Sequence, residues 1–309
     1  MTRSLILGVG GQDGSFLAEE LLASGRQVLG LGRRSTFPYS IRSHKFVYRQ
    51  LDIAESGELD VCLRDFQPDE VFHVAAVHGS AGFPYEEVWG KALDVNTKSL
   101  HRVLEFARLE NPQLKIFYAS SAKIFGPALR GRIDLSTPRK GSCLYSISKK
   151  ASGYLASYYR NAHGIKTTVA ILFNHESERR LEQFFIPKIC KAISSALTNP
   201  MHRESLYTLS FYCDWSCARD FMRMARLAVE SDVTGEVIFA SGVTWHGRDF
   251  AEQLFARHGL DYSRHIQTQE LSEAQYFEVN LEETLQKFEI GPRQNILSLC
   301  DNLITRPTH

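Results

Sequence analysis

A glycine-rich loop near the N-terminus constrains the fold of this chain most strongly. It follows an apolar run at residues 4–9 that is long enough for a buried strand, and a helical pattern begins directly after it. Gly8, Gly11 and Gly14 are spaced three residues apart, which lets the backbone turn tightly and approach a pyrophosphate at the helix N-terminus. The order of strand, loop and helix therefore predicts a dinucleotide-binding site that also includes Gln12 and Asp13. A glycine-rich turn without a ligand is the alternative.

Short apolar runs and helical patterns alternate as far as residue 173. Strands are expected at residues 4–9, 27–32, just before 51, 70–76, 115–119 and 166–173, and helices at 86–109 and about 142–163. Alternation with short connections predicts an α/β fold with a parallel, doubly wound sheet of the Rossmann type. Further helices are expected at 184–196, 217–229, 250–258 and 283–288, a strand at 237–240, mixed structure at 207–215, and loose residues at 305–309.

The composition of the sequence changes after residue 173, where a polar run follows an apolar strand. We therefore expect a dinucleotide-binding domain at residues 1–173 and a smaller substrate lobe at residues 174–309, from which single segments are free to return to the sheet. The polar run, residues 174–180, is either a ligand-binding edge or a solvated loop. Residues 77–83 form another loop at a strand's carboxyl end, where open α/β sheets bind ligands. For His78 in this loop, an ordinary loop histidine is the favoured interpretation over a catalytic one.

The residues after the second expected strand bear on the choice of cofactor. Dinucleotide folds that select NAD often place an acid here for the ribose hydroxyls, whereas this chain has Arg33, Arg34 and Ser35. Two guanidiniums and a hydroxyl suit a ribose 2′-phosphate, so NADP(H) is favoured over NAD. A solvated basic turn is the alternative. Three more residues at expected strand ends are assigned to the cofactor: Asp52, Ile53 and Ala75.

A serine, a tyrosine and a lysine can together transfer a proton. Tyr145 and Lys149 are four residues apart, so on a helix they share one face, with Cβ atoms roughly 6 Å apart. A lysine ammonium on that face favours the phenolate, and Ser121 at the end of a strand can hydrogen-bond the same substrate oxygen. The three groups can take a proton from an alcohol while its carbon gives up a hydride, or do the reverse. The Tyr-x-x-x-Lys spacing alone also occurs by chance.

Composition narrows the partners and the compartment. Lys plus Arg number 36 and Asp plus Glu 35, and no charge block predicts binding to nucleic acid or to an anionic membrane. No apolar run approaches the ~20 residues that span a bilayer, and the first residues do not resemble a signal peptide. The six cysteines include no Cys-x-x-Cys, and the eleven histidines no His-Glu-x-x-His. Reduced thiols, a cytoplasmic location and no metal site are therefore expected.

Five stretches resemble the GDP-mannose 4,6-dehydratases, a family within the extended short-chain dehydrogenase/reductase superfamily. They are residues 11–19, 33–37, 172–182, 214–220 and 242–250. The resemblance spans nearly the whole chain, and Asn-His-Glu-Ser at 174–177 is its most specific part. It implies a tightly held NADP(H), a nucleotide-linked hexose such as GDP-mannose as substrate, and a homodimer or homotetramer with the loop after Arg34 at one interface.

The resemblance also implies a reaction and a set of site residues. In the family the tyrosinate removes the sugar O4 proton while hydride leaves C4 for NADP. A proton then leaves C5, water leaves C6, and the hydride returns to C6. By position, the residues near the cofactor would be His175 and Arg180, in addition to Tyr145 and Lys149. Those at the nucleotide sugar would be Ser121, Asn174, Arg179, Lys188 and Arg248.

Several substitutions depart from the family pattern. Ser120-Ser121-Ala122-Lys123 stands where the family has Ser-Thr-Ser-Glu, so Lys123 replaces the glutamate that is the C5 base. Neutral lysine can act as a base only if its pKa falls by about three units, which costs on the order of 4 kcal/mol. Inverting UDP-N-acetylglucosamine 4,6-dehydratases resemble this stretch with Ser-Thr-Asp-Lys. Their lysine handles C5 and their aspartate is the acid for the departing water, but Ala122 stands at that acid's position. Cys213 and Gln275 replace family arginines that serve the nucleotide diphosphate.

Three functions stay open on this evidence. The first is an NADP-dependent, dehydratase-like enzyme acting at C4 of a nucleotide-linked sugar, with Ser121, Lys123, Tyr145 and Lys149 as catalytic residues. The second is a nucleotide-sugar 4-keto reductase, 4-epimerase or dehydrogenase that has lost the elimination step. The third is a non-catalytic NADP-binding partner or sensor, against which the intact Ser/Tyr/Lys set argues.

Overall fold

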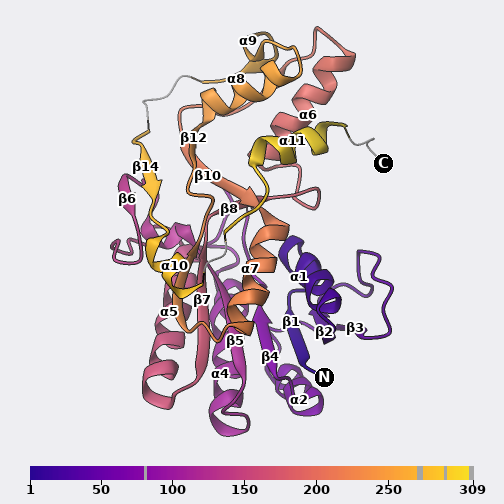
Figure 1. The fold of residues 1–309 in the computed structure, drawn as a ribbon, viewed down its shortest axis with the longest axis vertical. Coiled ribbons are helices and arrows are strands. Elements are labelled where there is room, and N and C mark those ends of the chain that lie inside the picture. The colour runs from indigo at the N-terminus through magenta and orange to yellow at the C-terminus, as the bar shows by residue number, and fades with distance from the viewer. Residues whose placement is uncertain (80–81, 270–273, 289–290, 306–309) are drawn as a thin grey trace.

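A sheet of seven parallel strands forms the centre of the molecule (Figure 1). The computed structural model describes residues 1–79, 82–269, 274–288 and 291–305. The strands lie in the order β11-β7-β5-β4-β1-β2-β3, and every neighbouring pair is parallel. Their bounds are β1 Arg3–Leu7, β2 Gln27–Gly32, β3 Phe46–Gln50, β4 Glu70–His73, β5 Lys115–Ser121, β7 Lys166–Leu172 and β11 Gly235–Phe239. This confirms the predicted parallel, doubly wound sheet.

Helices cover both faces of the sheet, because successive side chains of a strand point to opposite faces. Ile6 of β1 joins the apolar cluster under α1 and α7, whereas Leu5 and Leu7 join the cluster under α2, α4 and α5. The helix bounds are α1 Gln12–Ala23, α2 Ser56–Phe66, α4 Ser99–Leu109, α5 Leu144–His163 and α7 Ala218–Glu230. Helix α7 and strand β11 follow residue 174 in the chain but belong to these layers.

The helix expected at residues 86–109 differs from the prediction. It begins at Trp89 and consists of α3 (Trp89–Leu93), a π-helical turn η1 (Asp94–Lys98) and α4. The π-helical turn carries Asn96, which is fully buried. The Asn96 side chain accepts a hydrogen bond from Val77 N at 2.9 Å and donates one to Ser148 Oγ at 3.0 Å. These two hydrogen bonds stabilise the π-helical turn and connect the loop after β4 to α5.

A second group of elements lies above the carboxyl ends of the strands, at the top of Figure 1. Its buried side chains form a separate apolar cluster around Trp215 and Phe250. The group contains α6 (Phe185–Thr198), α8 (Gly247–Arg257), α9 (Tyr262–His265), α11 (Ile296–Thr305), and a three-stranded sheet of β8 (Asn174–Glu176), β10 (Tyr212–Cys217) and β12 (Thr244–His246). The remaining elements are β6 (Gly131–Ile133) paired with β14 (Phe277–Val279), β9 (Glu204–Ser205) paired with β13 (Ile266–Gln267), the short 3₁₀ helix η2 (Ala122–Phe125) and α10 (Glu282–Lys287).

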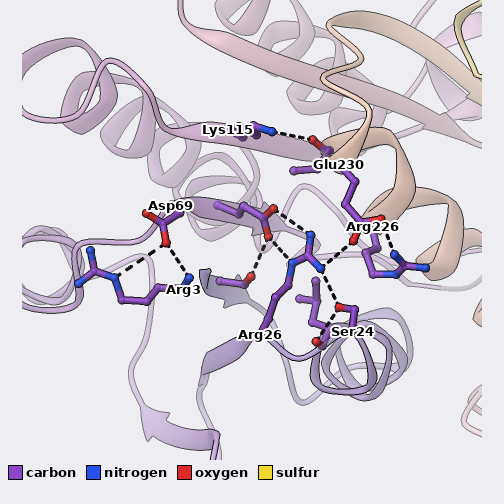
Figure 2. Close-up of polar contacts among 11 residues, drawn as sticks. Arg3, Ser24, Arg26, Asp69, Lys115, Arg226 and Glu230 are labelled. Atoms are coloured by element: carbon purple, nitrogen blue, oxygen red, sulfur yellow. Dashed lines mark hydrogen bonds and ion pairs between the residues drawn. The ribbon is translucent and has the colours of Figure 1, made fainter. Parts of the chain in front are cut away.

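A buried ion-pair network lies where the strands of the central sheet begin, and it joins the sheet to α7 (Figure 2). Arg26, between α1 and β2, is 7% exposed, and its Nε donates to Glu70 of β4 at 2.8 Å. Its Nη1 donates to Ser24 and to Glu230 at the end of α7, each at 2.7 Å. The Ser4 hydroxyl completes the shell of Glu70 at 2.8 Å. Because each charge has several partners, the network tolerates burial and fixes α7 to the sheet at the end opposite the loops.

Two expectations concern residues outside the described ranges. Residues 80–81 of the loop at 77–83, and residues 306–309 of the expected loose end, are among them. In the described part of the chain, no helix is both long and apolar enough to cross a membrane.

Candidate active site

The glycine-rich loop brings two predicted cofactor residues into close contact. Gly8 has a φ of +94°, and a Cβ added there would lie 2.7 Å from the Cα of Ala75, which follows β4. A Cβ on Gly14 would lie 2.3 Å from the carbonyl oxygen of Gly8. Only glycine fits these positions, because any side chain would collide with backbone atoms. The resulting loop at the N-terminus of α1, with Gly11 as N-cap, suits the close approach of a pyrophosphate.

The predicted 2′-phosphate residues follow β2 at the same edge of the sheet. Arg33, Arg34 and Ser35 are all exposed. Their backbone is tied to β3, since the Tyr48 hydroxyl donates to the Arg34 carbonyl at 2.5 Å and Gln50 donates to the Arg33 carbonyl at 3.1 Å. The two guanidiniums therefore sit on an anchored backbone with access to a ligand.

Asp52 and Ile53 follow β3 at that edge. The Asp52 carboxylate accepts a bond from Ala54 N at 3.1 Å and lies 3.5 Å from Lys91 Nζ, whereas Ile53 is buried. The assignment of Asp52 to the cofactor stays a prediction.

Ser121, Tyr145 and Lys149 come together at the carboxyl end of β5. Ser121 is the last residue of β5, and a side-chain hydrogen bond joins its hydroxyl to that of Tyr145 on α5. Lys149 is 1% exposed, and its Nζ donates to the carbonyl of Ala119 at 2.7 Å. The same Nζ lies 5.8 Å from the ring centre of Tyr145 and 4.6 Å from that of Tyr118. The predicted helical spacing thus places both side chains against the strand end.

Burial controls the ionisation of this set. It lowers the pKa of Lys149 from 10.5 to about 7. It raises the pKa of Tyr145 above its ordinary value, and the hydrogen bond from Ser121 opposes that rise. Because both shifts disfavour the charged forms, the protein alone holds Tyr145 as a neutral phenol. A phenolate therefore needs further positive charge or a hydrogen-bonding ligand next to the tyrosine.

Lys123 stands apart from this buried set. It lies in η2 with an exposed side chain, and its backbone N–H donates to Ser121 Oγ at 3.3 Å. Ala122 beside it offers no polar group. A lysine base at this position needs a desolvated environment, but the desolvated lysine of this site is Lys149.

The polar segment after β7 contacts the glycine loop. His175 Nε2 lies 3.0 Å from both carboxylate oxygens of Asp13, and its Nδ1 lies 2.8 Å from the carbonyl of Phe173. The Gln12 amide donates to the His175 carbonyl at 3.3 Å and accepts a bond from the Ser177 hydroxyl at 2.8 Å. Three predicted cofactor residues, Gln12, Asp13 and His175, therefore form one cluster.

Charge in this cluster is balanced within the segment. Burial alone would lower the pKa of His175, but the Asp13 carboxylate raises it above its ordinary value. Burial raises the pKa of Glu176 to about 7, against the effect of Arg180, whose Nε lies 3.4 Å from Glu176 Oε2. The Arg180 guanidinium also stacks on the ring of Phe184 at 3.6 Å. Arg180 therefore lies between the cofactor cluster and the start of α6.

Arg179 contacts α1, and its assignment to the substrate stays a prediction. Its Nη1 donates to Ser15 Oγ at 2.8 Å, and its Nη2 pairs with Glu19 on α1. The guanidinium lies between two rings, 4.1 Å from the centre of Phe16 and 4.4 Å from that of Tyr39. The structure thus places Arg179 against α1 and the loop after Arg34, on the side of the predicted cofactor.

The other predicted substrate residues are dispersed over the upper lobe. Asn174 donates to the buried thiol of Cys213 at 2.8 Å. Lys188 is half-buried in α6 and Arg248 is exposed at the start of α8. Within the described ranges no hydrogen bond or ion pair connects the side chains of Lys188 and Arg248 to the other predicted residues. Their assignments stay predictions.

Cys213 and Gln275, which stand where the family has arginines, lie near an aromatic contact. Burial raises the pKa of Cys213 well above its ordinary value, so the thiol stays protonated. The preceding residue, Tyr212, meets the exposed ring of Tyr276 edge to face at 5.4 Å. Tyr276 follows Gln275 directly, so neutral and aromatic groups occupy the place of the two family arginines.

Sequence reasoning missed the aromatic contacts of the tyrosine. His78 packs against the Tyr145 ring with centroids 4.5 Å apart, a contact that the interpretation as an ordinary loop histidine did not include. Tyr85 and Phe184 complete the contact, with ring centres 5.9 Å from Tyr145 and 6.3 Å from His78, respectively. The position of His78 after a strand was a usable signal, but nothing in the spacing of Phe184 or Asn96 indicated a role.

Comparison with known proteins gives one consistent family. The family model described as GDP-mannose 4,6 dehydratase matches residues 5–293. A GDP-mannose 4,6-dehydratase of Yersinia enterocolitica is 29% identical over 276 residues, which are 84% of this chain and 73% of that protein. One from Vibrio cholerae is 30% identical over 264 residues, 81% of this chain and 70% of the relative.

Solved structures agree in fold. The dTDP-glucose 4,6-dehydratase of Bacillus anthracis in complex with NAD superposes with a TM-score of 0.83 at 17% identity, covering 98% of this chain and 96% of that one. The UDP-glucose 4-epimerase of Thermotoga maritima with UDP-glucose gives a TM-score of 0.84 at 14% identity, covering 98% and 97%. At such identities the likeness concerns the fold.

Proposed function

Because the chain belongs to the GDP-mannose 4,6-dehydratase family, we propose that it is an NADP(H)-dependent enzyme that transfers a hydride at C4 of a nucleotide-linked sugar. The observation that carries the proposal is the meeting of half-buried Ser121 with buried Tyr145 and Lys149 at the carboxyl end of β5. A protein that only binds a dinucleotide has no need of this combination. The relatives of this chain named above are GDP-mannose 4,6-dehydratases, which also supports the proposal.

The chain's own residues fit a nicotinamide dinucleotide. The glycine loop at Gly8–Gly14 would hold the pyrophosphate, since a Cβ at either end would fill the space close to the backbone. Arg33 and Arg34 would hold a 2′-phosphate, which is the basis for proposing NADP(H) over NAD. When bound, the nicotinamide accepts or supplies the hydride. His175 contacts Asp13 of the loop and Arg180 lies beside Glu176, and both are proposed cofactor contacts.

Proton transfer belongs to the protein. As a phenolate, which bound ligands would have to stabilise, Tyr145 would take the proton of the sugar O4 hydroxyl when C4 is oxidised, and return it when C4 is reduced. The Ser121 hydroxyl, already bonded to Tyr145, would hold the same oxygen in line. Lys149 would supply positive charge below the phenol, to an extent that varies near neutral pH because its pKa is about 7.

A second candidate function depends on the fate of the sugar after hydride transfer. Elimination of water needs a base for C5 and an acid for the leaving hydroxyl. Ala122 has no polar side chain and Lys123 is exposed, so neither provides a desolvated acid or base. This observation favours a 4-keto reductase, 4-epimerase or dehydrogenase, in which the reaction ends at C4.

The test is turnover of a substrate panel by the purified chain. GDP-mannose, GDP-heptose, UDP-N-acetylglucosamine and their 4-keto forms are incubated with NADPH or NADP, and product and cofactor are followed together. Stoichiometric cofactor turnover identifies a reductase or dehydrogenase, a 4-epimer without net cofactor change an epimerase, and a 6-deoxy-4-keto product without net change a dehydratase. Tyr145→Phe, which keeps the ring, is expected to lose turnover about 10²- to 10⁴-fold and still bind NADPH. No turnover of any sugar by a wild type that binds NADPH would instead support a binding protein.

A further inference from the structure

His78 has a fixed position on the face of the proposed catalytic tyrosine. Its ring lies 4.5 Å from that of Tyr145, inclined by 31°. Its Nδ1 lies 2.7 Å from the hydroxyl of Tyr85, whose ring is nearly parallel to that of Tyr145. Phe184, at the start of α6, covers another side of the imidazole. The histidine is therefore held between the loop after β4, α5 and the upper lobe.

The backbone that carries His78 is held as firmly as the side chain. Val77 N donates to the fully buried Asn96, which in turn donates to Ser148 on the helix of Tyr145. Gly79 N donates to the Tyr85 hydroxyl at 3.3 Å. The histidine and the tyrosine thus share one scaffold, and the π-helical turn that supplies Asn96 is part of it.

The Tyr85 hydroxyl lies between the imidazole and the backbone of the same loop. Its oxygen accepts a bond from Gly79 N–H and lies 2.7 Å from Nδ1 of His78, and for the role proposed below the tyrosine hydroxyl is the donor of this second bond. A neutral imidazole whose Nδ1 accepts a hydrogen bond carries its proton on Nε2. Within the described ranges, Nε2 has no hydrogen-bond partner. In this tautomer the Nε2–H group is the donor of the imidazole.

The surroundings keep this imidazole neutral. Burial lowers the pKa of His78 to about 3, and the facing cations Lys123, Arg180, Lys149 and His175 act in the same direction. The histidine thus keeps one donor and no charge across the range in which enzymes are assayed. A neutral imidazole can polarise a substrate oxygen without adding a cation next to the phenol.

We propose that His78 is a further catalytic residue, whose Nε2–H donates a hydrogen bond to an oxygen of the hexose at or next to C4 and holds the sugar over Tyr145. The inference rests on the proposed function, because it assumes a sugar bound at Tyr145. No bond is made or broken by His78 itself. Its contribution is a preorganised donor that strengthens as charge develops on the sugar oxygen.

Two variants at the same position separate this role from packing. His78→Phe keeps an aromatic ring against Tyr145 but has no donor, whereas His78→Gln places an amide N–H close to the position of Nε2. For the sugar that the wild type turns over, His78→Phe is expected to reduce kcat/KM about 10- to 100-fold. His78→Gln should recover about tenfold of that loss, and both should bind NADPH as the wild type does. Undiminished kcat/KM in a folded His78→Phe variant would overturn the proposal.

A readout that needs no turnover tests the tautomer. In ¹⁵N-labelled protein at pH 7, the ring signals of His78 should show a protonated Nε2 and an unprotonated Nδ1, and Tyr85→Phe should mix the two tautomers. A proton on Nδ1 in the wild type would refute the proposal whatever the activity. If the wild type turns over no sugar, the proposed function fails and the donor role fails with it. If the wild type does turn over sugar and His78→Phe leaves kcat/KM unchanged, only the proposed role of His78 fails.

Discussion

His175 Nε2 lies 3.0 Å from both carboxylate oxygens of Asp13, across a separation of 162 residues in the chain. This contact closes the segment after β7 onto the glycine loop. Each partner shifts the other toward its charged form, although burial opposes both charges. The pair therefore stabilises the approach of the two segments that would enclose a cofactor.

Asp13→Asn is expected to destabilise the cofactor-free protein more at pH 6 than at pH 9. Since the folded pKa of His175 is raised, its contribution is present below the unfolded value near 6.5 and is lost as pH rises through the folded value. The measurement is urea unfolding at both pH values. Asp94→Asn is the control, because Asp94 pairs with Lys98 on the surface at 2.7 Å and faces no histidine in that pair. An equal effect of Asp13→Asn at the two pH values would contradict the assignment of charge to the pair.

Lys149→Met is expected to abolish activity while it stabilises the cofactor-free chain, more so at low pH. Burial lowers the pKa of Lys149 from 10.5 to about 7, so between these values the unfolded chain binds a proton that the folded chain lacks. Stability consequently rises with pH through this window, and the penalty is greatest below pH 7. The gain from the substitution should be larger at pH 6 than at pH 9 by on the order of 2 kcal/mol.

Denaturant unfolding of the Lys149→Met variant at the two pH values checks this. Lys150→Met is the matched control, because the adjacent lysine donates to the Arg139 carbonyl at 2.9 Å and is only half-buried. A gain that does not depend on pH would show that Lys149 carries no buried-charge penalty.

Arg34→Ala is expected to weaken NADPH binding about tenfold or more and to leave NADH binding nearly unchanged. A lost charge-assisted hydrogen bond to the 2′-phosphate costs about 1.5–3 kcal/mol, and 1.4 kcal/mol is a factor of ten. Titration calorimetry with both cofactors measures the two affinities. Arg42→Ala, an exposed arginine of the same loop, should change neither. Equal losses for NADPH and NADH would argue against a 2′-phosphate site at Arg34.

Lys123→Glu is expected to create elimination in an enzyme that lacks it. On the proposal that the exposed lysine leaves the sugar at the C4 stage, a carboxylate at this position restores the type of base that the family uses. Once it has taken the C5 proton, the same carboxyl group can act as the acid for the leaving hydroxyl. Mass spectrometry of the products detects the loss of water. Lys123→Gln removes the charge without adding a base and should not eliminate. The opposite result, with elimination by the wild type and none by Lys123→Glu, would make Lys123 itself the base.

Much of the site could be predicted because it depends on local pattern. Tyr145 and Lys149 share a helix face at fixed spacing, and Ser121 ends a strand, so their meeting follows from secondary structure and the topology of a parallel sheet. The contacts of Arg179 and His78 could not be read in the same way. Their neighbours, Ser15 and Tyr145, come from segments distant in sequence, and no periodicity connects them.

The sequence by itself determined the doubly wound fold, the glycine loop and the Ser/Tyr/Lys set, because backbone geometry and side-chain period are local properties. Only the tertiary structure decided the contacts between segments. It placed Asp13 against His175 and stacked His78 on Tyr145, and it left Lys123 in water while burying Lys149. Burial and charge at a site depend on everything packed around it. Lys123 and Lys149 therefore differ in environment because of the segments packed around them, which their sequence positions alone do not reveal.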